Sequence, residues 1–257
     1  RPLSEMWTQE KKDAAIRYLE DEQRDCSKLQ WAQEYLGMFV EDLNQFFSDE
    51  LIQEKCIVKK KTNVIPQRQY YLGVDIARMG EDKSSFEILE KINSETIEQV
   101  ESITTTKTLT TSTFDTIIQL DNIYNFAKIG IDAGSGSLGV GIMDFLLRSP
   151  VKKKVVALNN LSRQIDYSGK KKKTLMKEDM YQNMLAMLQS NKLKLLDDDY
   201  VRLSLKSIQY EYLNEKGRAT TIRIFASHHT DSDICEGLIR AAWLANTKSL
   251  NHSIYWV

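Results

Sequence analysis

The sequence is poor in the residues that break or crosslink a chain. It has 3 Pro, 11 Gly and 3 Cys in 257 residues, which excludes a collagen-like, low-complexity or linker-dominated protein. No run of about 18 apolar residues is present, so no transmembrane helix is predicted. The first residues, RPLSEMWTQEKKD, include neither an initiator Met nor a hydrophobic signal region. We therefore expect a fragment of a longer protein that is not secreted.

Neither sign of charge is in excess. The 35 Lys and Arg residues against 36 Asp and Glu give a net charge of -1, so any contact with nucleic acid must come from local basic clusters. The cysteines, Cys26, Cys56 and Cys235, form neither a CxxC zinc pattern nor a disulfide framework, which is typical of a reducing compartment. The hydrophobic fraction of 42% is sufficient for a core.

The chain is predicted to have two parts with a boundary near residue 62. Residues 1–56 have a helical pattern, in which the apolar side chains from Trp31 to Phe47 recur at the spacing of an amphipathic helix. The stretch IVKKKTNVIPQ is predicted to connect this helical part to residues 63–257, because it combines a basic run with a proline.

From Gln69 onward the pattern alternates between strands and helices. Three strands in succession, followed by alternating helices and strands, predict an α/β fold with a mixed central sheet. Ser112 is the expected cap of the first helix in this part. The predicted strands are 69–77, 84–91, 96–108, 128–133, 152–160 and 217–226, and the predicted helices are 113–127, 134–149, 175–190, 197–213 and 231–246.

Three acidic residues lie where the chain changes direction. Asp75 is at the end of the first strand, and Asp132 ends the fourth strand before the turn AGSGS. Asp233 starts the last helix, with Glu236 one turn later on the same face. A sheet with the first and fourth strands side by side would bring Asp75 and Asp132 together. Clustered carboxylates repel one another unless a cation neutralises them, and their hard oxygen atoms suit Mg²⁺ or Mn²⁺.

Each acid also has a purely structural interpretation. Asp75 could pair with Arg78 or with a loop backbone, Asp132 could start an Asx turn, and Asp233 with Glu236 could be a helix cap. The three acids together are more informative than any one of them, because an ionised carboxylate on a buried strand is costly without a partner.

Three motifs resemble the nuclease domain of viral large terminase subunits. They are GVDIARMGEDKSS (73–85), KIGIDAGSGSLGVGIMDFLL (128–147) and HHTDSDICEGLIRAAWL (228–244). The segment QEYLGMFVEDLNQFFSDELI (33–52) resembles the stretch that joins the terminase ATPase to its nuclease. The resemblance implies a ribonuclease-H-like nuclease domain over residues 63–257, and it makes residues 1–62 the helical tail of the ATPase domain with the linker. No GxxxxGK[ST] loop is present, so the ATPase motor itself is not expected here.

The resemblance also implies an endonuclease that cuts concatemeric double-stranded viral DNA during genome packaging. Carried over by motif, Asp75, Asp132 and Asp233 are the catalytic metal ligands, and Asp82 falls at a second acidic position of the first motif. The last motif departs from the family's D-D-x-x-D-A-L, so Asp231 stands as the alternative third ligand. Two Mg²⁺ or Mn²⁺ ions would then support hydrolysis of the phosphodiester.

The implied partners are double-stranded DNA, the terminase small subunit and the portal protein, without a membrane, and the implied location is the host-cell cytoplasm. Lysine clusters are the predicted DNA contacts, because phosphate contacts give affinity without sequence choice. The alternative for either cluster is a solvated loop. The lysines are Lys152, Lys153, Lys154, Lys170, Lys171, Lys172 and Lys173.

Two other functions are compatible with the same residues. One is a resolvase-like or transposase-like nuclease of the same fold, which the linker motif at 33–52 disfavours. The other is a non-catalytic DNA-binding or assembly module, which the intact candidate acids disfavour.

Overall fold

The computed structural model describes residues 7–25, 45–61, 63–76, 83–106, 109–134, 139–165, 169, 171–172, 174–213, 221–226 and 232–247. The chain divides into two compact units, Arg1–Asn44 and Gln45–Val257. The described part of the first unit contains the helix α1 (Gln9–Asp25). Most of the amphipathic helix predicted around Trp31 lies outside the described residues.

The segment 45–58, which the sequence places before the boundary at residue 62, belongs to the second unit. Phe46 and Phe47 are buried but not helical, unlike the predicted helix that ends at Phe47. The backbone N–H of Phe46 donates to the carbonyl oxygen of Ile208, which ties this segment to another strand instead of a helical turn. Ser48 then caps α3 (Asp49–Lys55), and β1 (Cys56–Val58) follows directly.

Within the described residues, seven strands form one sheet in the order β1-β7-β4-β3-β2-β5-β6. The pairs β2–β3 and β3–β4 are antiparallel, whereas β5 is parallel to both β2 and β6. The mixed sheet confirms the predicted fold class. The strands are β2 (Gln69–Asp75), β3 (Lys83–Lys91), β4 (Ile97–Thr106), β5 (Lys128–Ile131), β6 (Val155–Ala157) and β7 (Leu193–Leu196), and a separate antiparallel pair is formed by β8 (Ile208–Leu213) and β9 (Thr221–Ala226).

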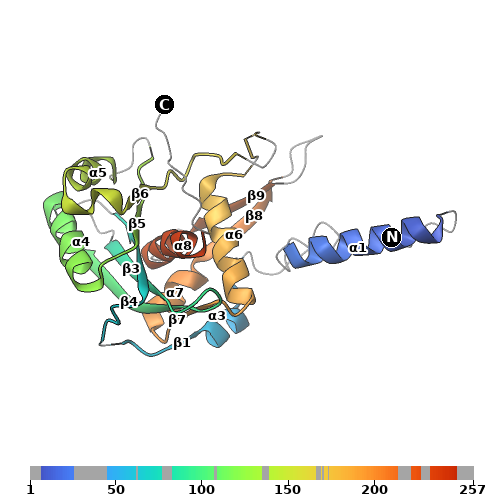
Figure 1. Cartoon of the computed structure of the whole chain (residues 1–257), viewed down its shortest axis with the longest axis horizontal. Helices are drawn as coiled ribbons and strands as arrows, with labels where there is room; N and C mark the ends of the chain where they lie inside the picture. The colour runs from blue at the N-terminus through green and yellow to red at the C-terminus, as the bar shows by residue number, and fades with distance from the viewer. Residues whose placement is uncertain are drawn as a thin grey trace. The chain divides into compact units, whose positions relative to one another are not determined.

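Helices cover both faces of the large sheet. Figure 1 shows α4 and α5 on one side of it, with α8 and α6 on the other. Among the described residues, no helix combines the length and the apolar character that crossing a membrane requires. The helices are α4 (Thr110–Tyr124), α5 (Gly139–Leu147), α6 (Met176–Gln189), α7 (Asp199–Lys206) and α8 (Asp233–Asn246), with a short 3-10 helix η1 (Pro150–Lys153).

Alternation along β2 separates the core from the candidate site. Tyr70, Leu72 and Val74 pack into the hydrophobic core against residues of α4 and α5. Residues at the intervening positions therefore point to the opposite face, which α8 covers. Gly73 and Asp75 are two of these residues, so the sheet itself directs Asp75 towards α8.

Two of the predicted elements differ in the structure. The predicted helix 113–127 begins at Thr110 with Leu109 as its cap residue, so Ser112 is not the cap. The predicted helix 197–213 is divided into α7 and β8. The sequence pattern does indicate a strand after α7, because Ile208, Tyr210 and Tyr212 alternate with polar residues at the period of a strand.

Helix α8 lies directly on the sheet because two glycines face each other. A Cβ atom added to Gly73 would lie 2.0 Å from the carbonyl oxygen of Gly237, and one added to Gly237 would lie 2.7 Å from Ser85 Oγ. Only residues without a side chain permit this approach. The contact holds the first turns of α8 beside the carboxyl ends of β2 and β5.

Candidate functional site

Asp75 and Asp132 lie side by side at one edge of the sheet. β2 and β5 are parallel with Val74 opposite Ile131, so the residues that follow are neighbours. This pairing confirms that the first and fourth predicted strands are adjacent. The Asp75 side chain is 22% exposed and that of Asp132 is 24% exposed, which leaves both carboxylates reachable from solvent.

A buried arginine contacts both of these carboxylates. The Arg240 side chain is 1% exposed, with Nη1 3.2 Å from Asp75 Oδ1 and Nη2 3.8 Å from Asp132 Oδ2. Nη2 is also 3.4 Å from Glu236 Oε2, one helical turn earlier. Burial raises the pKa of Asp75 to about 7, with Glu236 and Asp233 adding to the rise and Arg240 opposing it. The site therefore holds more negative charge than one guanidinium balances.

Glu236 is fixed by α6 on its other side. Its Oε1 accepts a hydrogen bond from Tyr181 Oη at 2.8 Å and forms an ion pair with Lys177 Nζ at 2.7 Å. Burial acts to raise the pKa of Glu236, but Lys177 and Arg240 bring it below its usual value. Its Oε2 is buried without a hydrogen bond, so the ion pair with Arg240 is its described interaction.

Asp132 is oriented by two donors. The backbone N–H of Gly134 donates to Oδ1 at 3.0 Å, which is the Asx turn expected as the structural interpretation. Asn160 Nδ2, from the residues that follow β6, donates to Oδ2 at 2.9 Å. The turn and a functional role are compatible, because each oxygen of a carboxylate has a second lone pair to offer.

Asp233 faces the beginning of β3. Its Oδ2 accepts a hydrogen bond from the Lys83 backbone N–H at 3.3 Å, and its carbonyl oxygen accepts one from Ser85 Oγ at 2.6 Å. These bonds join the start of α8 to the same edge of the sheet. Asp231 and Asp82, the remaining predicted ligands, lie outside the described residues.

The sequence pointed to three acids, whereas the structure surrounds Arg240 with a partly different set. Within the described residues, no group of three or more His, Cys, Asp or Glu side chains is arranged to hold a metal ion. The site contains two groups that were not predicted as members, Glu236 and Arg240. Their signal was the spacing i, i+3, i+7 from Asp233, which places all three on one face of α8.

The described lysines of the two clusters lie at opposite ends of the parallel strands. Lys152 and Lys153 are exposed in η1, before the start of β6, whereas Asp132 follows the end of β5. Lys154 is paired with Asp121, because its Nζ lies 2.9 Å from both carboxylate oxygens of that residue. This first cluster is therefore at the edge away from the acids.

The second cluster follows the carboxyl end of β6 on the side of the acids. Lys171 is exposed and forms a β-bridge with Ile165. Lys172 donates from its backbone N–H to the carbonyl oxygen of Gln164 at 2.7 Å, and its Nζ lies 3.4 Å from Asp179 Oδ2. Lys170 and Lys173 lie outside the described residues.

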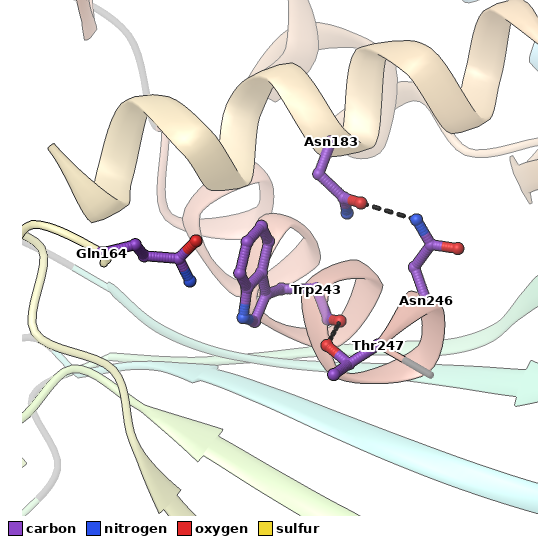
Figure 2. Close-up of a pocket in the computed structure, with 5 residues that line it drawn as sticks. All are labelled: Gln164, Asn183, Trp243, Asn246 and Thr247. Carbon is purple, nitrogen blue, oxygen red and sulfur yellow. Dashed lines mark hydrogen bonds between the residues drawn. The ribbon is translucent and has the colours of Figure 1, made fainter. Parts of the chain in front are cut away.

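A pocket of about 300 Å³ lies between α6 and the end of α8. Figure 2 shows the Trp243 indole between Gln164 on one side and the adjacent side chains of Asn183 and Asn246 on the other. Asn246 Nδ2 donates to Asn183 Oδ1 at 2.7 Å, so these amides satisfy one another. None of the predicted site residues lines this pocket. The acids and the pocket are separate features of α8.

This chain has similar solved structures but no matching family or curated sequence. No family model and no curated protein matches the sequence. The crystal structure of the large terminase nuclease from thermophilic phage G20c with bound magnesium matches with a TM-score of 0.57 at 15% identity, over 78% of this chain and 97% of that chain.

Two longer terminases match over more of the chain. The large terminase from another thermophilic bacteriophage, in complex with ADP, has a TM-score of 0.58 at 14% identity over 90% of this chain and 51% of that one. The HK97 bacteriophage large terminase has a TM-score of 0.53 at 8% identity, over 93% of this chain and 51% of that one. The chain thus has the fold found in large-terminase nucleases, which confirms the predicted ribonuclease-H-like architecture.

Proposed function

We propose that this chain is the nuclease region of a viral large terminase and that it cuts double-stranded DNA with the help of divalent metal ions. The main support is the position of Asp75 and Asp132 at the carboxyl ends of adjacent parallel strands, where α/β folds place their reactive groups. The fold is shared with the G20c nuclease, whose structures include forms with bound magnesium and with bound cobalt. Concatemeric viral DNA is the proposed substrate.

The donor types suit a hard divalent cation, although the described side chains are not arranged around a common ion position. Asp75 and Asp132 offer carboxylate oxygens, and Glu236 Oε2 is a buried oxygen without a hydrogen bond. Oxygen donors of this kind suit Mg²⁺ and Mn²⁺. We assign Asp75 and Asp132 as ligands, with Asp233 or Glu236 as the third, and we place Asp231 and Asp82 as further candidates.

When bound, such ions, two in the proposal, would activate a water molecule and neutralise charge on the scissile phosphate. The chain's own residues prepare the site. Asn160 and the Gly134 N–H hold Asp132 in one orientation, and Lys177 with Tyr181 holds Glu236. The carboxylate of Asp75 must be ionised to act as a ligand.

The proposed architecture follows from the same family. Residues 1–62 would be the tail of an ATPase domain with its linker, and residues 63–257 the nuclease. The terminase small subunit and the portal protein would be the partners, in the cytoplasm of the host cell. The second lysine cluster, which lies on the side of the acids, is the better candidate for a DNA contact.

One observation favours a second candidate, a non-catalytic DNA-binding or assembly module. Arg240 already neutralises part of the acidic group, as an internal partner would in a site that no longer binds metal. The two candidates make different predictions for metal dependence, so one assay separates them.

The test is nicking of supercoiled plasmid by the purified chain in Mn²⁺, Mg²⁺ or EDTA. The nuclease proposal expects relaxed and linear products with either metal and none with EDTA. Binding of the plasmid without cleavage in any metal would support the non-catalytic module instead.

A further inference from the structure

We propose that Arg240 is a positioning residue that serves as a stand-in cation: it holds Asp75, Asp132 and Glu236 together without metal and competes with a divalent ion for the two aspartates. The inference rests on the proposed metal site. It goes further by giving a role to a basic residue among the acids, which the nuclease chemistry itself does not require.

The geometry supports a cation that gathers the acids. The guanidinium of Arg240 reaches carboxylates from three elements, namely β2, the residues after β5, and α8 itself. Three carboxylates at one point repel one another, and burial further disfavours the charged forms of Asp75 and Glu236. A positive charge among them lowers this repulsion, so the acids can stay close in the metal-free protein.

The distances also show which carboxylates Arg240 holds less firmly. Nη2 lies 3.8 Å from Asp132 Oδ2, beyond hydrogen-bond range, and Nη1 lies 3.2 Å from Asp75 Oδ1, at the long end of that range. Arg240 Nη1 additionally donates to the carbonyl oxygen of Glu236 in its own helix, and Arg240 Nε is buried without a hydrogen bond. The side chain is therefore anchored on α8 and held to the two aspartates by looser contacts, mainly through charge.

With Asp233 as the third ligand, Glu236 stays paired with Arg240 when Asp75 and Asp132 bind metal. It is already paired with Lys177 and Tyr181, so its place does not depend on Arg240 alone. A divalent ion bound by Asp75 and Asp132 would lie close to the guanidinium of Arg240, and the two positive charges would repel each other. Metal binding by the wild-type protein must overcome that repulsion.

Two opposite effects follow from removing the charge. Arg240→Met and the more polar Arg240→Gln should both lower the melting temperature in EDTA, because the buried carboxylates lose their partner. Both should also bind Mn²⁺ more tightly, by about tenfold or more, since a competing charge is gone. An arginine that only supports the fold would change the first quantity and not the second.

The experiment measures Mn²⁺ affinity by calorimetry and melting temperature with EDTA or Mn²⁺, all without DNA. Arg240→Lys keeps the charge and should stay within about twofold of wild-type affinity. Arg202→Met, which removes an arginine paired with Asp197 and Asp199 elsewhere, is the matched control and should leave Mn²⁺ affinity unchanged.

Neutral variants that fold only when Mn²⁺ is present would support the inference, since the ion would then replace the guanidinium. Neutral variants that fold with unchanged or weaker affinity would overturn it, and so would variants that do not fold even with Mn²⁺. The outcomes are separable from the nuclease proposal. If the wild type cleaves DNA but both neutral variants bind Mn²⁺ with unchanged affinity, only this inference is contradicted. If the neutral variants bind Mn²⁺ more tightly but the wild type does not cleave DNA, only the nuclease proposal is contradicted.

Discussion

Asp75 and Glu87 are both acids on strands of the central sheet, yet their surroundings are different. Glu87 lies fully buried in β3 and accepts hydrogen bonds from Gln99 Nε2 at 2.7 Å and Ser102 Oγ at 2.9 Å. Burial raises the pKa of Glu87 well above its ordinary value, and the two hydrogen bonds only partly oppose this. Asp75 instead opens to solvent beside Arg240. Glu87 is thus enclosed in a structural hydrogen-bond network, whereas Asp75 is available for chemistry.

Glu87 leads to a prediction about pH. Its folded-state pKa is raised, so the folded protein keeps a proton that the unfolded chain loses above its ordinary pKa of about 4.5. The free energy of unfolding of the wild type therefore falls as pH rises from that value through the raised pKa. Glu87→Gln removes the titration and keeps partners for Gln99 and Ser102. Urea denaturation should show the free energy of unfolding of this variant rising relative to wild type as the pH increases above about 4.5.

The exposed Glu95, changed to Gln, is the control for Glu87 and should show little change with pH relative to wild type. A difference between Glu87→Gln and wild type that is constant or shrinks as pH rises would mean that Glu87 is ionised in the folded protein.

The residues of the site were only partly predictable. The sequence placed Asp75 and Asp132 at the ends of two strands that would be neighbours, and the pairing of β2 with β5 confirms that placement. Arg240 and Glu236 were not assigned, because their roles depend on how α8 is rotated over the sheet. That rotation follows from the contact of Gly73 with Gly237, which joins residues far apart in sequence.

The packing of α8 on β2 determines where the acids lie, and one substitution tests it. Gly73→Ala would place a methyl group 2.0 Å from the Gly237 carbonyl oxygen, where only backbone atoms can yield. We expect it to lower the free energy of unfolding by about 3 kcal/mol or more, since overpacking commonly costs about 1–3 kcal/mol where side chains can adjust.

Gly141→Ala is the matched control within the same protein. No atom lies within 4 Å of a Cβ added to Gly141, which is in the helix α5. Its replacement should stabilise the protein by about 0.5–1 kcal/mol, through helix propensity. Chemical denaturation measures both variants. Equal effects of the two substitutions would show that α8 does not approach the sheet as closely as described.

Elements with strong local patterns were predicted better than those formed by distant pairing. The helix around Met176, Met180, Met184 and Met187 is present, and all four side chains are buried. The strands β1 and β7 were not predicted, because each is short and forms its inter-strand hydrogen bonds with residues far away in sequence. The strand β8 was missed because it directly follows the helix α7, and the predicted helix was extended over both.

For the whole molecule, a net charge of -1 makes the position of the lysines decisive for DNA binding. Replacing Lys170 to Lys173 by alanine should weaken binding to any duplex about equally, because phosphate contacts do not read bases. The slope of log affinity against log salt should fall by up to about 0.9 for each phosphate that the protein no longer neutralises. Fluorescence anisotropy at several salt concentrations measures both quantities, and cleavage at saturating DNA should persist.

Lys152→Ala with Lys153→Ala is the control at the opposite end of the strands. This double variant should change the affinity and the salt slope less than replacement of the second cluster. The reverse order would place the DNA track across the first cluster, away from the acids.

The central claim is that the acids at the ends of β2 and β5 cut DNA with the help of metal. Its most direct measurement is the single-turnover rate of duplex cleavage in Mn²⁺ for wild type, Asp75→Asn and Asp132→Asn, with Asp144→Asn on the exposed side of α5 as control. Loss of residues that merely orient a ligand costs about 10–100-fold, so loss of either ligand should cost at least about a hundredfold. The control should match wild type, and all variants should still bind DNA. Wild-type cleavage by Asp75→Asn would contradict the account.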